Sequence, residues 1–145
     1  MTPTPTIPGI EALLARHLLD DALPAADLAE LLAALRPVEV AAGDVVLRQG
    51  DPGDDLCLVL SGRLAVRVDR ADGPPTLLDE VGPGGVVGEM ALLTGQPRTA
   101  TVVALEPSRL ARLARVDFER LAARQPAALG GLLRRILPRL RGNQL

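Results

Sequence analysis

The hydrophobic positions near the N-terminus recur at the spacing of amphipathic helices. One set is Ile10, Leu13, Leu14, His17 and Leu18, and the second is Leu28, Leu31, Leu32 and Leu35. Pro24 stands where the second helix would begin, and Pro37 stands where it would end. The pattern predicts two N-terminal helices within residues 10–36. The Pro- and Thr-rich residues 1–9 are expected to be a disordered leader.

From Val38 onward, short runs rich in strand-forming residues replace the helical spacing. These runs are VEVA, DVVLRQG, LCLVLSG, RLAVRVD, TLLDEV, TATVVAL and RLARLA. The segments between them, such as AAGD, GDPGDD and GPGG, supply the Gly, Pro and Asp that tight turns need. Short strands at this regular spacing favour a small antiparallel sandwich or barrel over a parallel sheet with crossover helices. Residues 37–115 are therefore predicted to form an antiparallel β segment.

Helical spacing returns after the last β-rich run. Asp117 is predicted to cap a helix that runs through Phe118, Leu121 and Ala122. Beyond Pro126 a second apolar stripe comprises Leu129, Leu132, Leu133, Ile136, Leu137 and Leu140. The sequence thus predicts C-terminal helices over residues 116–141. Because helices flank the β segment at both ends, the whole chain is predicted to be one α+β domain.

The composition argues against a nucleic-acid partner, an internal disulfide and a membrane-spanning helix. Phe118 is the one aromatic residue among 145, so the stacking platforms of single-strand nucleic-acid binders are missing. The net charge of −2 at pH 7 offers no general attraction to nucleic acid. Cys57 is the only cysteine, which excludes an internal disulfide and fits a reducing, cytoplasmic setting. No apolar run reaches the roughly 18 to 20 residues that a membrane-spanning helix needs.

Residues for catalysis or metal binding are sparse. His17 is the only histidine, so the clustered ligands of β-barrel metalloenzymes cannot be assembled. The glycines of GPGGVVGEM match neither a dinucleotide-binding nor a P-loop fingerprint. The arginines beside the last apolar stripe fit a solvated helix face more simply than a membrane or nucleic-acid surface. We therefore expect neither catalysis nor a bound cofactor or metal.

The segment GEMALLTGQPRTATV, residues 88–102, places charged residues among small and apolar ones. Glu89–Leu93 is predicted to form one helical turn, which Gly95 closes with a positive φ and Pro97 keeps from continuing. The first main-chain N–H groups of such a turn lack acceptors within it, and they point toward whatever lies beyond its start. The segment therefore predicts an anion site supplied by the main chain.

Two charged side chains refine this prediction. Arg98 can offer a bidentate fork to a phosphate, and Glu89 can accept a hydrogen bond from a hydroxyl. Gly88 lacks a Cβ, so a ligand can approach the main chain closely there. A ribose phosphate satisfies all three residues. A structural ion pair between Glu89 and Arg98 fits the same residues, and the residues alone do not separate the two interpretations.

The segment also resembles, over its whole length, the phosphate-binding cassette of the cyclic nucleotide-binding domain family. Members of this family occur in bacterial cAMP-responsive regulators, protein kinase regulatory subunits and nucleotide-gated channels. GDVVLRQGDPGDDLCLVLSGRLAV is similar to the family's early strands, and VDFERLAARQP is similar to its first C-terminal helix. The resemblance covers roughly residues 37 to 140. It implies an antiparallel β-roll, a jelly-roll-like double-stranded β-helix of about eight strands, with helices at both ends.

The resemblance further implies the residues that bind a nucleotide. Glu89 would accept a hydrogen bond from the ribose 2′-hydroxyl, and Arg98 would hold the cyclic phosphate beside Gly88. Main-chain N–H groups near Met90, Ala91, Thr99 and Ala100 would complete the anion site, with a further bond from the Thr99 hydroxyl. The last helix of such domains serves as a lid over the base. Here the lid would use Leu133, Ile136 and Leu137.

Departures from the family pattern concern the base. The family often has aromatic residues at the positions of Cys57 and Val87, and both are smaller here. No aromatic is available for the lid, so the base contact is expected to be aliphatic or through Arg. Thr99, which follows Arg98, is compatible with either cAMP or cGMP, and we favour cAMP.

The expected function is that of a non-enzymatic regulatory sensor module whose lid helix moves when a cyclic nucleotide binds. No effector domain follows the predicted lid in this sequence, so we expect the output to act on a partner in trans, to act through self-association as a homodimer, or to have been lost because the sequence is a fragment of a longer protein. The alternative is a β-roll that serves as a scaffold for dimerisation or protein interaction and does not respond to nucleotide.

Overall fold

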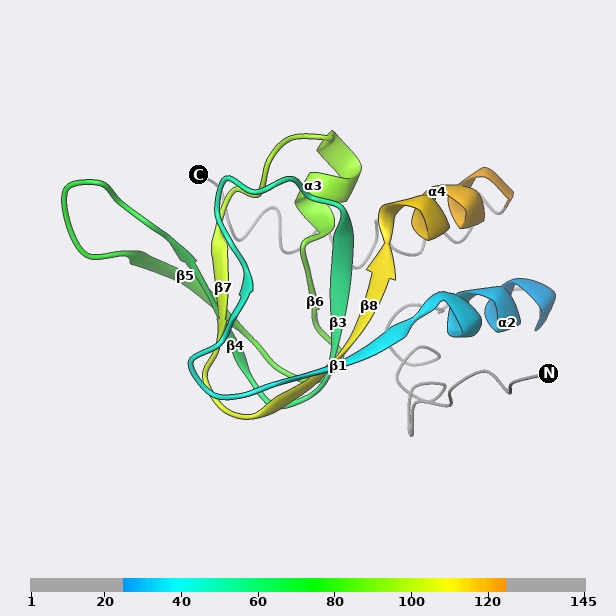
Figure 1. Cartoon of the computed structure of the whole chain (residues 1–145), viewed down its shortest axis with the longest axis horizontal. Helices are drawn as coiled ribbons and strands as arrows, with labels where there is room; N and C mark the ends of the chain where they lie inside the picture. Colours follow the sequence, from blue (N-terminus) through cyan, green and yellow to red (C-terminus); the bar gives the residue numbers. More distant parts are fainter. Residues whose placement is uncertain (1–24, 125–145) are drawn as a thin grey trace.

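The structure is a computed structural model and describes residues 25–124. Within this range eight strands form two antiparallel four-stranded sheets (Figure 1). Sheet A has the order β1-β8-β3-β6, formed by Arg36–Val40, Ser108–Ala114, Asp55–Ser61 and Val86–Val87. Sheet B has the order β2-β7-β4-β5, formed by Val45–Leu47, Thr101–Ala104, Leu64–Val68 and Thr76–Val81. The helices are α2 (Ala25–Ala34), α3 (Glu89–Thr94) and α4 (Arg115–Arg124). This architecture confirms the predicted antiparallel β-roll with flanking helices.

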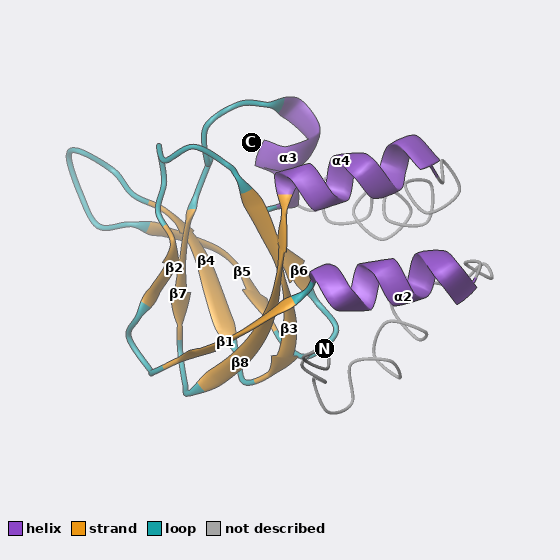
Figure 2. Cartoon of the chain, turned by 45° about the vertical axis from the view of Figure 1, so that its right-hand side comes forward, coloured by secondary structure: helices purple, strands orange, loops and turns teal. Residues whose placement is uncertain are grey.

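Sheet A separates two hydrophobic clusters, because successive side chains of a strand point to opposite faces. On β3, Leu56 and Leu58 belong to one cluster, whereas Cys57 and Val59 belong to the other. The first cluster also contains Phe118 and Leu121 of α4 and Leu92 of α3, together with Leu35. The second cluster fills the roll interior, between sheets A and B, and includes Leu64, Val102 and Leu110. Figure 2 shows α2 and α4 side by side next to sheet A.

The boundary between the N-terminal helix and the β segment differs from the prediction. Pro37 does not end α2, which already ends at Ala34, and it lies inside β1. β1 is at the edge of sheet A and pairs with β8 alone. An edge strand tolerates proline because only one side of the strand has a neighbour to which it must donate.

Asp117 is not the N-cap of α4. β8 ends at Ala114 and α4 begins at the next residue, Arg115, so Asp117 lies in the first turn. There its carboxylate lies 3.6 Å from the Arg120 guanidinium, and its charge complements the positive end of the helix dipole.

Several sequence predictions lie outside the described residues. They are the disordered leader over residues 1–9, the first predicted helix over residues 10–18 and the apolar stripe over residues 129–140 with its lid residues. Among the helices of residues 25–124, none is long and apolar enough to cross a membrane.

Candidate functional site

The cassette, residues 88–102, begins with the helical turn that its sequence predicts. α3 covers Glu89–Thr94 and is preceded by Gly88, whose φ is +87°. Gly95 ends it with a φ of +72°, and the Gly95 N–H donates to the Ala91 carbonyl oxygen at 2.9 Å. A left-handed glycine directly after the last turn is a common way to end a helix, and the prediction made from this glycine is confirmed.

The absence of a side chain at Gly88 leaves room for the Arg98 guanidinium, a contact that the sequence did not predict. A Cβ added there would lie 2.6 Å from Nη1 of Arg98 and 3.0 Å from the main-chain oxygen of Asp55. The Gly88 carbonyl oxygen accepts a hydrogen bond from the same Nη1 at 3.1 Å. In this structure the close approach that glycine permits is therefore made by a guanidinium of the chain itself.

Arg98 is buried and held by its main chain as well as by its side chain. Its residue is 8% exposed, although an arginine is normally among the most exposed residue types. The Arg98 N–H donates to the Asp51 carbonyl oxygen at 2.8 Å, and the Gly50 N–H donates to the Arg98 carbonyl oxygen at 2.9 Å. These two bonds fix the Arg98 backbone against the loop between β2 and β3, so the guanidinium has a defined position.

The charge partner of Arg98 is Asp55, at the start of β3. Nη2 of Arg98 donates to Oδ1 of Asp55 at 2.7 Å, and the two side chains are 6% and 22% exposed. Arg98 thus forms a structural ion pair, but its described partner is not Glu89. The turn segment GDPGDD is predicted to include Asp55, and this is wrong, because Asp55 is the first residue of β3 and lies on the same face as Cys57.

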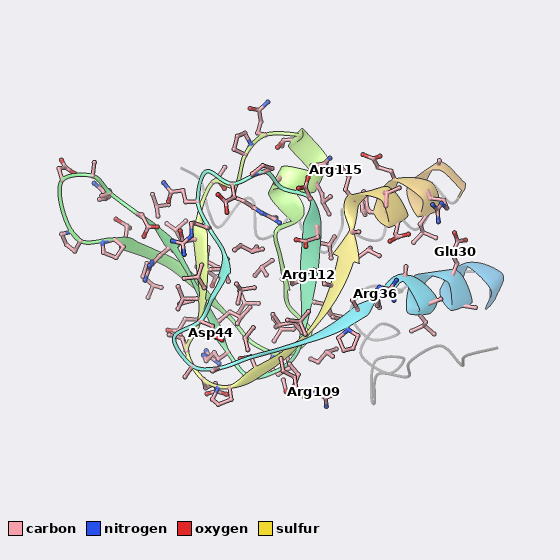
Figure 3. All side chains as sticks on the ribbon, viewed as in Figure 1. Glu30, Arg36, Asp44, Arg109, Arg112 and Arg115 are labelled. Atoms are coloured by element: carbon pink, nitrogen blue, oxygen red, sulfur yellow. The ribbon has the colours of Figure 1, made fainter. Side chains whose placement is uncertain are left out.

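A second arginine approaches the same carboxylate. Nε of Arg112, which comes from β8 and is labelled in Figure 3, lies 3.1 Å from Oδ2 of Asp55. This contact brings the charges together without hydrogen-bond geometry, and Nε is buried with no acceptor among the described residues. Asp55 therefore lies between two guanidinium groups, one of which has an unused donor.

Sequence reasoning missed both Asp55 and Arg112. The available signal was the alternation of side chains along their strands. Asp55 shares the parity of Cys57 and Val59, and Arg112 shares that of Leu110, and these three apolar residues all lie in the roll interior. A charged residue at an inward position of a strand requires a partner or a ligand.

A cavity of about 210 Å³ lies beside these groups. Its lining comprises Val46, Leu47, Arg48, Asp51, Pro52, Asp54, Asp55, Arg98 and Arg112. Three arginines and three aspartates therefore share one small space. An anion that enters can pair with the arginines, but it must compete with carboxylates that already lie there.

The Gln49 end of the same loop is anchored by a buried threonine. The Thr101 hydroxyl donates to Oδ2 of Asp69 at 2.6 Å and accepts a hydrogen bond from the Gln49 N–H at 3.0 Å. The hydrogen bond from Thr101 lowers the pKa of the Asp69 carboxyl below its ordinary value. Asp69 is therefore ionised at neutral pH, and the loop that carries Gly50 and Asp51 is tied to the end of β4.

Cys57 lies in β3, two residues after Asp55, and its thiol is buried. It is fully buried in the roll interior. Burial raises the pKa of its thiol, although the nearby Arg112 guanidinium acts in the opposite direction. Burial thus favours the protonated thiol, which is the less reactive form. Within residues 25–124, no group of three or more His, Cys, Asp or Glu residues could hold a metal ion.

The other predicted site residues are placed as follows. Ala91 is buried in α3, Ala100 is half-buried and Thr99 is exposed. Glu89 and Met90 form the start of α3, but their side chains are outside what the structure describes. The structure thus brings Gly88 and Arg98 together, and the pairing of Glu89 with a ligand stays a prediction.

The profile of the family described as cyclic nucleotide-binding domain matches residues 37–125, more than half of the chain. Acetyltransferase Pat of Mycolicibacterium smegmatis is 51% identical over 80 residues, which are 55% of this chain and 24% of that protein. The chain spans less than a third of the length of each of the first curated relatives that it matches.

Two solved structures share the fold. The regulatory domain of Toxoplasma gondii PKA, in a structure with cAMP, superimposes with a TM-score of 0.73 and 31% identity over 82% of this chain and 47% of that one. The regulatory subunit of a cAMP-independent protein kinase A from Trypanosoma brucei gives a TM-score of 0.73 and 28% identity over 88% of this chain and 46% of that one. The match of the family profile over the β-roll and the cassette, on a fold common to these proteins, shows that this chain belongs to the cyclic nucleotide-binding domain family.

Proposed function

We propose that this chain binds a 3′,5′-cyclic nucleotide, with cAMP favoured over cGMP, and acts as a regulatory sensor module. The observation that carries the proposal is the position of Arg98. It is a buried guanidinium of the cassette, fixed by its main chain, and it lines a cavity whose other walls come from β2, the loop before β3, Asp55 and Arg112. The chain that carries it belongs to the cyclic nucleotide-binding domain family. A guanidinium forms strong charge-assisted hydrogen bonds with a phosphate. We propose no reaction for this chain.

Arg98 would hold the cyclic phosphate, and Glu89 would accept a hydrogen bond from the ribose 2′-hydroxyl. Main-chain N–H groups near Met90, Ala91, Thr99 and Ala100 would complete the phosphate site. Arg98 is 6% exposed while it is paired with Asp55, so a phosphate that reaches it must displace or rearrange that carboxylate. Asp55 can then turn fully toward Arg112, whose Nε lacks an acceptor among the described residues.

The preference for cAMP rests on the residues available to the base. Phe118, the only aromatic residue, is buried with α4 against sheet A and cannot stack on a base in the roll. A base held by aliphatic contacts gains little from the extra polar groups of guanine. The solved structure of the related Toxoplasma gondii domain contains cAMP, which supports the same choice.

The output of the sensor would be a movement of the C-terminal helices. α4 leaves β8 without a loop, so a shift of the cassette against β8 would reach α4 directly. The lid residues Leu133, Ile136 and Leu137 would then close over the base. The energy for this movement is the difference in nucleotide affinity between the open and closed states. The effector, the oligomeric state and the cytoplasmic setting stay predictions.

The second candidate function is a β-roll scaffold that does not respond to nucleotide. One observation favours it, because the chain itself supplies a counter-charge to Arg98 in Asp55, 2.7 Å away. The similar regulatory subunit from Trypanosoma brucei is described as cAMP-independent, which keeps this alternative open for a chain with this fold.

Calorimetric titration of the purified chain with cAMP, cGMP and 5′-AMP separates the two functions. We expect saturable binding of cAMP, weaker binding of cGMP and far weaker binding of the acyclic nucleotide. At a concentration one hundred times the Kd, cAMP should add about 2.7 kcal/mol to the free energy of unfolding. That corresponds to a rise in Tm on the order of 5 to 11 °C for a domain of this size. Absence of both heat and a Tm shift at millimolar cAMP and cGMP would favour the scaffold.

A further inference from the structure

Arg115 is the first residue of α4, and it occupies the junction between β8, α3 and the turn before β3 (Figure 3). Its main-chain N–H donates to the Asp54 carbonyl oxygen at 2.7 Å, which continues the pairing of β8 with β3. Its side chain is 30% exposed. The residue therefore has a fixed backbone and a largely enclosed side chain at the root of α4.

The Arg115 guanidinium donates to three main-chain carbonyl oxygens. Nη2 donates to Gly53 and, at 3.0 Å, to Ala91, and Nη1 donates to Leu92 at 3.4 Å. Ala91 and Leu92 are among the last four residues of α3, whose carbonyl groups receive no N–H from within the helix. The Ala91 carbonyl oxygen accepts from the capping Gly95 N–H as well as from Arg115. A cation at this end also complements the helix dipole. Arg115 thus caps α3 from another helix.

The turn at Gly53 is packed directly against α3. A Cβ added at Gly53 would lie 1.9 Å from the Cβ of Ala91, so no larger residue fits without moving one of the two segments. Arg115 binds the carbonyl groups on both sides of this contact. Two residues after Gly53 comes Asp55, which pairs with Arg98. The guanidinium therefore holds together the two segments that define the geometry around Arg98.

We propose that Arg115 is a positioning residue for the phosphate site and the point at which that site is coupled to α4. It sets the position of α3 and of the Gly53 turn, and any change in either segment on binding reaches α4 through its first residue. The effect of Arg115 on ligand affinity rests on the proposed function. Its effect on the positions of α3 and the Gly53 turn does not rest on that function, because it can be measured in the ligand-free protein.

Lysine is a poor substitute for this role. An ammonium group keeps the charge, but it is a compact donor and lacks the planar fork that reaches several carbonyl groups at once. Glutamine lacks the charge and reaches less far. Arg120, on the same helix, offers a matched control, because it is exposed and its ion pair is with Asp117 of the same helix, away from the cassette.

The test compares Arg115→Gln, Arg115→Lys and Arg120→Gln in the whole chain by hydrogen–deuterium exchange and by calorimetric titration with cAMP. In the ligand-free protein, Arg115→Gln should speed exchange at least several-fold in peptides that cover residues 50–55 and 88–95. The rest of the roll should keep its protection. Arg115→Lys should lie between Arg115→Gln and the wild type, and Arg120→Gln should match the wild type. The affinity for cAMP should fall about tenfold in Arg115→Gln.

The outcomes test separately the positioning role of Arg115, its coupling to the phosphate site and the proposed function. Unchanged exchange in both segments, or an equal effect of Arg120→Gln, overturns the positioning role. Faster exchange with unchanged cAMP affinity overturns the coupling to the site and leaves the proposed function intact. If the wild-type chain itself binds no cyclic nucleotide, the proposed function and the coupling fail together, and the exchange data alone decide whether Arg115 positions α3 and the Gly53 turn.

Discussion

Replacing Arg98 with alanine is expected to lower the affinity for cAMP about 100-fold or more and to abolish the Tm shift at ligand concentrations that saturate the wild type. Two hydrogen bonds from a cation are together worth about 3 kcal/mol or more, which is roughly 100-fold in affinity. The substitution also leaves Asp55 without the partner that now lies 2.7 Å away, so its charge would repel a phosphate. Calorimetry gives the affinity directly.

Arg98→Lys is the control for a loss of cAMP binding that is caused by misfolding. Breaking a buried ion pair destabilises a protein, whereas lysine retains the charge opposite Asp55. We expect Arg98→Lys to fold and to bind cAMP about tenfold more weakly than the wild type, because lysine lacks the bidentate fork. Arg48→Ala removes an exposed charge from the same cavity lining and should cost only a few-fold. Equal effects of the Arg48 and Arg98 substitutions would place the phosphate elsewhere.

Asp55→Asn is expected to act in the opposite direction and to raise the affinity for cAMP about tenfold. The carboxylate competes with the incoming phosphate for Arg98 and repels it. Two like charges about 6 Å apart at an effective dielectric constant of about 20 repel by about 3 kcal/mol. Partial exposure of Asp55, at 22%, reduces that figure. Asparagine keeps an oxygen that can accept from Arg98, so the guanidinium stays oriented.

The ligand-free stability of Asp55→Asn should fall at the same time, because buried Arg98 then lacks a counter-charge. The ligand-induced rise in Tm should therefore exceed that of the wild type. Asp54→Asn is the matched control, since it removes the same charge from the lining of the same cavity at an exposed position. A loss of affinity in Asp55→Asn would mean that the carboxylate mainly orients Arg98, and it would overturn the competition described here.

The parts of the site that the sequence could predict are those set by local chemistry. The turn over Glu89–Thr94 and its end at Gly95 depend on residues within one short segment. The β-roll follows from the regular spacing of strands and turns along the chain. β6 was not predicted as a separate run, because two valines between glycine-rich turns give no alternation to detect.

The parts that the sequence could not predict depend on contacts between distant segments. Asp55 and Arg98 are 43 positions apart, and Arg115 and Gly53 are 62 apart. Pairings of this kind follow from strand register, which composition and periodicity do not determine. The same limit explains why the contact between Gly88 and the Arg98 guanidinium was not predicted, and the role of Gly88 at a ligand stays a prediction.

The most direct measurement is the structure of the chain in complex with cAMP. We predict that phosphate oxygens lie at charge-assisted hydrogen-bond distance, about 2.7 to 2.9 Å, from the Arg98 guanidinium. Asp55 should no longer occupy Nη2 of Arg98 and should lie closer to Arg112. A nucleotide bound away from Arg98, or a phosphate in the cavity while the Arg98–Asp55 pair keeps its 2.7 Å contact, would contradict this account.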